Sequence, residues 1–350
     1  MEDVQVTGTV KRLGFSLEFT NDNSQLSLAK MESAEAKNET PDDHRSLQSI
    51  AVGAGLPEAV RTYVSAALTD NTRRAYQGDL ADFLRWGGVV PCSPKTIAAY
   101  IANRAETHSP HTITRRVVGI SRAHVSQGFA DPAKNDVVRT VLRGVRKTHV
   151  RSQRQVAPLL KQDLLSLLPL MQGTKGIRDR ALILLGFATA LRRSELIALD
   201  VQDLSFVNEG LIVLLRKSKT DQMGEGRKIA VPYGRTSACP VKAIEEWLEH
   251  AQITSGAIFR SVSKGGRIAE ERLSAQTVAV VLKIYAQKAG LKASDVSGHS
   301  LRSGLVTSAA QVGASAYKIQ QQTGHRSAEM LNRYIRDANL FENNAAGMVL

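Results

Sequence analysis

The sequence lacks the features on which several protein classes depend. Its 350 residues include two cysteines, Cys92 and Cys239, which are too few for a disulfide framework or a zinc-binding set. No apolar run approaches the roughly 20 residues of a membrane span, and the first residues do not read as a signal peptide. Aromatic residues make up only 5% of the chain, but hydrophobic residues reach 43%, enough for packed cores. We therefore expect a cytoplasmic protein without a membrane anchor.

Charge is unevenly distributed along the chain. The formal net charge is +13, yet residues 1–50 hold five Lys/Arg against nine Asp/Glu, which leaves +17 on residues 51–350. A basic body of this size favours a polyanionic partner such as double-stranded DNA. A DNA-bound form would be associated with the nucleoid.

Patterning divides the chain into an extension and two domains. Residues 1–50 have no sustained period and are expected to be disordered or weakly structured. Residues 56–148 carry helical periods at 57–68, 71–86, 94–106, 111–127 and 134–148, and we interpret them as a helical DNA-binding domain. Residues 149–156 are basic, lack an apolar face and are typical of a linker.

The second domain is predicted to span residues 157–350. Helical periods at 161–170, 176–190, 193–198, 240–251, 274–288, 301–311, 315–322 and 327–336 flank strand-like runs at 201–206, 211–215 and 228–232. The fold class we expect is therefore mainly α with a small antiparallel β-sheet, in two domains. The short apolar stretch 340–350 would need a surface to bury it, in the same chain or on another copy.

Candidate DNA contacts gather at predicted helix starts and in the basic run before the linker. Small hydroxyls and arginines at a helix N-terminus suit phosphate oxygens and base edges. A solvated surface would explain either helix start alone, whereas two on a basic domain favour DNA. The candidates are Thr72, Arg73, Arg74, His111, Thr112, Thr114, Arg115, Arg116, Arg143, Arg146, Lys147 and Arg151.

The strongest chemical signal lies near the C-terminus. His299 and Arg302 stand three residues apart and would share one helix face, and His325 and Tyr334 follow in polar boxes between apolar stretches. Imidazoles, guanidiniums and a phenol, without acidic metal ligands nearby, suit a metal-free attack on a phosphate. We therefore predict no metal site and no cofactor.

Two upstream segments complete this set. Arg192 and Glu195 stand in a run that would otherwise be a charged helix–turn–helix corner. Lys219 lies in the polar turn 216–222 between two strand-like runs, where most lysines are merely solvated; Lys217 is a nearby competitor.

Together these boxes resemble the tyrosine recombinase (phage integrase) family over residues 56–350. The positions that match in order and spacing are Arg192, Glu195, Lys219, His299, Arg302, His325 and Tyr334. The local sequences at 297–300, 334–336 and 347–349 are similar to those of Cre recombinase within that family. Two departures stand beside the boxes: Ala190 replaces a usual glycine and Thr323 a usual apolar residue.

The resemblance implies a DNA clamp that acts without metal or ATP. Tyr334 would form a covalent 3′-phosphotyrosyl intermediate, with Arg192 and Arg302 bracketing the phosphate. By resemblance, Lys219 would protonate the leaving hydroxyl and His299 accept the tyrosine proton, with His325 on the phosphate and Glu195 in support. Strands would be exchanged through a Holliday junction by a homo-oligomer, two protomers on a site and four in the synapse.

Two alternatives stay open on the sequence. One is a type IB topoisomerase-like enzyme that relaxes DNA, against which the helical 56–148 domain argues. The other is a DNA-binding protein on this scaffold that no longer cuts, against which the filled catalytic positions argue.

Overall fold

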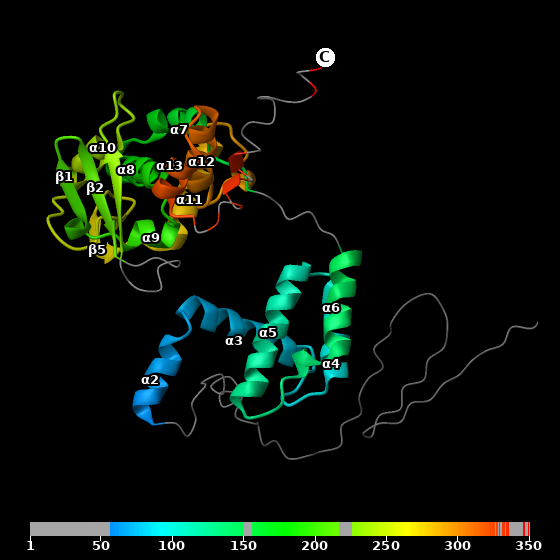
Figure 1. Ribbon diagram of the computed structural model, residues 1–350. Coiled ribbons are helices and arrows are strands. Elements are labelled where there is room, and N and C mark those ends of the chain that lie inside the picture. Colours follow the sequence, from blue (N-terminus) through cyan, green and yellow to red (C-terminus); the bar gives the residue numbers. More distant parts are fainter. Residues whose placement is uncertain are drawn as a thin grey trace, which may run out of the picture. The chain divides into compact units, whose positions relative to one another are not determined.

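The computed structural model describes residues 57–149, 156–216 and 226–325, and single residues from there on: 327, 329, 331, 332, 334, 335, 346 and 349. The expected extension 1–50, most of the linker and of the apolar tail, and the polar turn with Lys217 and Lys219 lie outside these residues. The chain divides into two compact units, before and after the boundary between residues 152 and 153 (Figure 1).

The first unit consists of helices, close to the bounds that the sequence predicts. They are α2 (Glu58–Ala66), α3 (Asp70–Arg85), α4 (Pro94–Ala105), α5 (Pro110–Ser126) and α6 (Asp136–Thr148). Polar N-caps explain where most of them begin, because the side chains of Thr69, Ser93, Ser109 and Asn135 each accept a backbone N–H of the first turn.

Helices α3 and α5 form the centre of this unit and run in opposite directions. Arg116 of α5 contacts Asp82, near the end of α3. Gly119, which follows Arg116 along α5, contacts Tyr76, which precedes Asp82 along α3. A Cβ on Gly119 would come within 3.1 Å of the Asp79 Cβ, so the two helices pack closely at this point. The first turns of α3 and α5 therefore lie at opposite ends of their contact.

The second unit combines helices with two small antiparallel sheets, as the fold class predicted. Its helices are α7 (Lys161–Leu167), α8 (Gly173–Thr189), α9 (Arg193–Ala198), α10 (Pro240–His250), α11 (Ala275–Lys288), α12 (Ser300–Gln311) and α13 (Ala316–Thr323). Residues 329, 331, 332, 334 and 335 are also helical, in agreement with the period predicted for 327–336.

The larger sheet has the order β1 (Leu204–Val207), β2 (Gly210–Leu215), β3 (Arg227–Pro232). Leu215 and Arg227 are the last residues of β2 and β3 to pair before the segment that connects the two strands. The strand expected at 201–206 is partly wrong, since residues 201–203 form a 3₁₀ turn and β1 ends at Val207. A second hairpin, β4 (Arg260–Val262) with β5 (Ile268–Arg272), was not predicted, because these strands are short, polar and mostly exposed.

Helix α8 organises the core of this unit. It lies between the sheet and α12 (Figure 1) and buries residues on all sides, among them Leu182 and Leu185. Trp247 of α10 is completely buried, and its indole N–H donates to the carbonyl oxygen of Ile258 at 2.8 Å. The C-terminal end of α8 leads directly into the segment that carries Arg192.

Candidate active site

The turn between α8 and α9 presents Arg192. Glu195, whose side chain is buried, accepts the backbone N–H of Arg192 at 2.9 Å through Oε2 and its guanidinium Nη1 at 2.7 Å through Oε1. An acidic residue at the third position of a helix often bonds back to the N-cap in this way. Glu195 therefore both caps the start of α9 and orients the guanidinium of Arg192.

Arg302 is held from the other side by the same turn. It lies in the first turn of α12, is 2% exposed, and donates through Nη1 to the carbonyl oxygen of Ala190 at 2.7 Å. Ala190 has a φ of +50°, the left-handed region that favours glycine, which explains why the resemblance leads one to expect glycine there. Burial, and then the charge of Arg192, lowers the pKa of Arg302 to about 10.

The second terminal nitrogen of Arg302 is available to a ligand. Nη2 is buried and has no hydrogen-bond partner among the residues that the structure describes. A buried guanidinium donor without an acceptor is costly unless an anion completes it. The position beside Arg192 is therefore suited to a phosphate oxygen.

His299 and Tyr334 meet at this position. His299 is the N-cap of α12, and its Nε2 lies 3.3 Å from Oη of Tyr334. Tyr334 is half-buried and packs with Leu331 and Ile335 on a small cluster with Val306 of α12. Burial, and then the charges of Arg302 and Arg192, lowers the pKa of His299, so its neutral form, with a lone pair for the phenol proton, is favoured.

His325 follows the C-terminus of α13. The chain turns at Gly324, with a φ of +64°, and the side-chain amide of Gln320 donates to the carbonyl oxygen of His325 at 2.9 Å. The imidazole lies 2.6 Å from Oγ1 of Thr323 through Nδ1, and its ring centre is 6.5 Å from that of Tyr334. Burial, and then the charge of Arg302, lowers the pKa of His325 to about 4.

An open hollow adjoins these groups. Its volume is about 450 Å³, and its lining consists of Arg192, Arg193, Ser194, Ser297, Gly298 and His299. The side chain of Arg193 lies against Gly298, where a Cβ would meet its Cδ at 3.1 Å. The hollow thus offers two arginines and a histidine to an anionic ligand.

Arg227 is a member of this cluster that the sequence did not reveal. It begins β3, and its Nη1 donates to the carbonyl oxygens of Gln321 and Gln322, both at 2.9 Å, at the end of α13. Its guanidinium lies so close to Gly324 that a Cβ there would stand 2.9 Å from Cζ. Its only sequence signal was its place just before the strand predicted at 228–232, and its partners are backbone atoms 94 and 95 residues away.

The lysine predicted for catalysis, Lys219, lies outside the described residues, as does Lys217. The hairpin that carries both is anchored at its base. On one side Arg216 pairs with Asp203 at 2.6 Å and Asp200 at 2.9 Å, and on the other Arg227 holds α13.

The candidate DNA contacts in the first unit fall into three groups. Because α3 and α5 run in opposite directions, the cluster of Thr72, Arg73 and Arg74 lies at the far end of their contact from that of His111, Thr112 and Thr114. Arg73 pairs with Asp70, and Arg74 donates to Asn71. His111 is exposed, whereas Oγ1 of Thr114 donates to the carbonyl oxygen of Pro110.

Arg116 has a structural position instead of an exposed one. Its side chain is 12% exposed, and Nη1 donates to Asp82 at 2.5 Å while Nη2 contacts His108 at 3.1 Å. Arg115 is more open, at 46% exposed, although it pairs with Asp79 at 2.9 Å. Arg116 therefore forms an internal ion pair, and we expect it to contribute less to DNA binding than the exposed basic residues.

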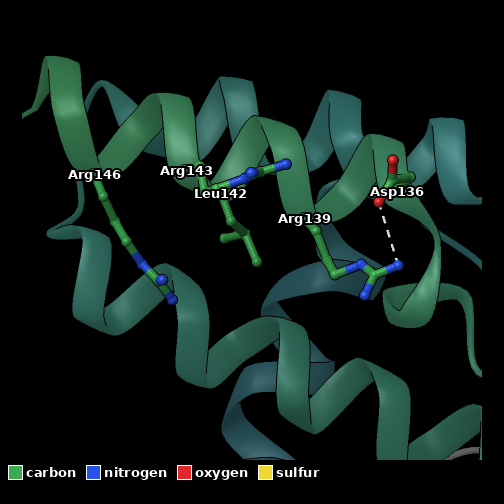
Figure 2. Close-up of a pocket in the computed structure, with 5 residues that line it drawn as sticks. All are labelled: Asp136, Arg139, Leu142, Arg143 and Arg146. Carbon is green, nitrogen blue, oxygen red and sulfur yellow. Dashed lines mark ion pairs between the residues drawn. The ribbon is translucent and has the colours of Figure 1, made fainter.

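Helix α6 displays its basic residues along one stripe. Figure 2 shows Arg139, Leu142 and Arg146 projecting from the same side of the helix, with Arg143 beside them; with Asp136 they line a hollow of about 420 Å³. Arg146 also donates to Oγ1 of Thr114 at 3.2 Å, which joins the end of α6 to the start of α5. Lys147 is exposed beside them, and Arg151 lies outside the described residues.

The described part of the chain shows neither a metal-binding cluster nor a membrane-spanning helix. In that part of the chain, no group of three or more His, Cys, Asp or Glu side chains is placed to hold a metal ion. No helix within it has the length and apolar character needed to cross a bilayer.

Sequence comparison relates the chain to a known family. Residues 158–340 match the model of the phage integrase family. An integrase/recombinase XerD homologue of Selenomonas ruminantium is 42% identical over 287 residues, which cover 79% of this chain and 84% of that protein. Tyrosine recombinase XerA of Pyrococcus furiosus is 27% identical, over 79% of this chain and 91% of its own.

Solved structures agree in fold. A lambda integrase dimer bound to a COC′ core site matches with a TM-score of 0.58 at 18% identity, over 84% of this chain and 77% of that chain. XerH recombinase bound to a palindromic difH substrate matches with a TM-score of 0.57 at 16% identity, over 79% and 78% of the two chains. On its sequence match over most of its length, this chain belongs to the phage integrase family, the tyrosine-type site-specific recombinases.

Proposed function

We propose that the chain cuts and rejoins DNA at a specific site through a covalent 3′-phosphotyrosyl intermediate, with Tyr334 as the nucleophile. The observation that carries this proposal is the 3.3 Å separation between Tyr334 Oη and His299 Nε2, next to Arg192 and Arg302. A phenol is a weak nucleophile until a base and cations surround it, and this position supplies both.

The reaction exchanges one phosphate ester for another. Tyr334 Oη gives its proton to His299 and forms a bond to the scissile phosphorus, while the bond from phosphorus to the 5′ oxygen of the next nucleotide breaks. We assign the proton for that oxygen to Lys219, so the leaving group departs as a free hydroxyl. Rejoining is the same exchange in reverse, with a 5′-hydroxyl as nucleophile, so bond energy is conserved and no ATP is needed.

The two guanidiniums stabilise the charge that builds on the phosphate. Arg192, oriented by Glu195, and Arg302, whose Nη2 has no partner in the described part of the chain, would hold the non-bridging oxygens through paired donors. Loss of one such donor costs on the order of 3 kcal/mol in comparable oxyanion sites. Because these charges are permanent, we propose that a metal ion is dispensable, and cleavage in excess EDTA tests that point.

DNA would be held by both units. We assign the exposed stripe of α6, with Arg143, Arg146 and Lys147, to the DNA backbone, together with the start of α5, which Arg146 joins to it. We retain the boundaries 56–148 for a DNA-binding domain, 149–156 for a basic linker and 157–350 for the catalytic domain. The protein would work in the compartment that contains the DNA.

Strand exchange needs more than one protomer. The lambda integrase structure is a dimer on its core site, which supports two protomers of this chain per site and four in a synapse, joined through a Holliday junction. The 340–350 segment, which is apolar in sequence, is our candidate for contact between protomers.

The decisive experiment uses a nicked DNA whose cleaved end diffuses away and traps the intermediate. The target must first be found, by footprinting the protein on DNA that flanks its own coding region. We expect an SDS-resistant adduct of the intact chain on this DNA, absent in Tyr334→Phe although that variant still binds. Equal adduct in Tyr334→Phe, or none in the wild type, would reject the assignment. Recombinant products, as opposed to relaxed circles alone, distinguish a recombinase from a topoisomerase.

A further inference from the structure

Thr323 makes two short contacts from a buried position beside His325. Its hydroxyl oxygen lies 2.8 Å from the carbonyl oxygen of Ile319, one turn earlier in α13, and 2.6 Å from Nδ1 of His325. Thr323 is 1% exposed and His325 7%, so water does not compete for these bonds. One hydroxyl group therefore faces a carbonyl acceptor and a ring nitrogen at the same time.

The direction of each bond follows from counting hydrogens. A carbonyl oxygen can only accept, so the single hydroxyl hydrogen of Thr323 must point at Ile319. The hydroxyl then accepts from His325, which places a hydrogen on Nδ1. If the hydroxyl hydrogen pointed at Nδ1 of His325 instead, lone pairs of the Thr323 hydroxyl oxygen and the Ile319 carbonyl oxygen would face each other at 2.8 Å. This tautomer is thus inferred from the bonding network, since hydrogens are not themselves located.

We propose that Thr323 holds His325 in its Nδ1–H form, so that His325 can donate a hydrogen bond to the scissile phosphate only as an imidazolium. This proposal rests on the proposed function. In the neutral ring, Nε2 carries a lone pair, which would face a phosphate oxygen unfavourably. The apolar residue expected before Gly324 would impose no such choice, because neutral His325 could then place its hydrogen on Nε2. Thr323 is accordingly a positioning residue that acts through His325.

The surroundings of His325 make its protonation depend on the DNA. In the absence of DNA, burial and neighbouring cations disfavour the charged ring, whereas an anionic phosphate at the site favours it. A proton would be taken up from solvent as the phosphate binds and returned on its release. The charged or titratable side chains around the ring, among the described residues, are Arg302 and His299 from α12, Arg192 before α9, Arg227 from β3, and Tyr334.

The rate of DNA cleavage depends on pH through both histidines. Cleavage then requires neutral His299 and protonated His325, so its dependence on pH has an acidic and an alkaline limb. The alkaline limb reports the loss of the proton from His325. It arises because Thr323 leaves the neutral ring without a hydrogen on Nε2. Replacing the hydroxyl with a methyl group frees the tautomer, and neutral His325 can donate through Nε2.

The kinetic test compares Thr323→Val with Thr323→Ser, which keeps the hydroxyl. Single-turnover cleavage of the nicked DNA is measured against pH with the full chain at saturating concentration. We expect the wild type and Thr323→Ser to lose cleavage about tenfold per pH unit on the alkaline side. We expect that limb to move up by at least one pH unit in Thr323→Val. Scaled profiles of Thr323→Val and wild type that superimpose would overturn the proposal.

A second measurement does not depend on cleavage. In the full chain labelled with ¹⁵N-histidine, the shifts of the two ring nitrogens report which one carries hydrogen, and loss of signals in His325→Gln identifies this ring among the eight histidines. We expect Nδ1–H in the wild type and Thr323→Ser, and a shift toward Nε2–H in Thr323→Val. Hydrogen on Nε2 of neutral wild-type His325 would refute the proposal. If the wild type forms no adduct at any pH, the proposed function fails, and the spectrum still decides the tautomer.

Discussion

Nε2 of His299 lies 3.3 Å from the phenolic oxygen of Tyr334, although the two residues are 35 positions apart in the chain. The N-cap of α12 supplies the imidazole, and the helical segment after α13 supplies the phenol. Both belong to one protomer, so the proposed nucleophile and its base already meet before DNA or a second copy is bound.

His299→Gln should reduce cleavage by about 10²–10⁴-fold, the range typical of a general base, and leave DNA binding unchanged. Burial and nearby arginines lower the pKa of His299, so the basic form persists below the ordinary histidine value. The acidic limb of cleavage at limiting protein should therefore have its midpoint below about pH 6.5, the unperturbed value for histidine, and disappear in the variant. If the limb persisted in His299→Gln, another group would be the base.

Arg302→Met should separate activity from stability. Cleavage should fall by about 10²–10³-fold, because a phosphate ligand is lost. The melting temperature should stay equal or rise by a few degrees, because the variant removes a buried charge, one nitrogen of which has no partner among the described residues. In return, the buried carbonyl oxygen of Ala190 loses its donor, which costs about 1–3 kcal/mol and limits the rise. Thermal unfolding checks this, and a marked drop in melting temperature would show that the guanidinium is structural instead.

Gly324→Ala should damage the site more than Gly313→Ala does. Both glycines have a left-handed φ, +64° and +77°, so both variants incur about 1–2 kcal/mol of backbone strain. At Gly324 the new Cβ would meet the guanidinium of Arg227. At Gly313 no atom lies within 4 Å of the position that a Cβ would take. We expect an additional loss of about 1–3 kcal/mol in urea unfolding and a clear loss of cleavage for Gly324→Ala. Equal effects at both positions would mean that Arg227 moves aside without consequence.

Arg116→Gln and Arg146→Gln should have opposite signatures. Arg116 is nearly buried between Asp82 and His108, so its loss removes a charged hydrogen bond to Asp82, which keeps Arg104 and Tyr100 as partners, and should cost about 1.5–3 kcal/mol of stability. It should not change the salt dependence of DNA binding. Arg146 is exposed, and Arg146→Gln should lower the slope of log affinity against log salt by about 0.9 for one lost phosphate contact, with little change in stability. Binding titrations at several salt concentrations check both, and an unchanged slope for Arg146→Gln would remove it from the interface.

Most elements of the fold were predictable because their signals are local. Ser93 and Ser109 before prolines marked the starts of α4 and α5, and apolar periods marked their lengths. The hairpin β4–β5 was missed because its residues show no alternation of apolar and polar side chains; its pairing depends on the surrounding chain.

The candidate catalytic residues could be proposed from the sequence as a set but not as an arrangement. Their types and spacing in sequence led to the family, and the family match agrees. The same reading placed Arg116 with the DNA contacts, because a sequence of basic residues does not reveal that Asp82 lies opposite one of them.

By itself, the sequence determined the helical character of this protein, its family, and which side chains are available for chemistry. Only the tertiary structure decided that Arg302 is fixed by the carbonyl of Ala190, that Arg227 closes the end of α13, and that Thr323 selects the tautomer of His325. The physical reason is that a side chain's identity states which bonds it can form. Its partner is set by the packing of distant segments, and above all by backbone carbonyls, which every residue carries and no sequence pattern distinguishes.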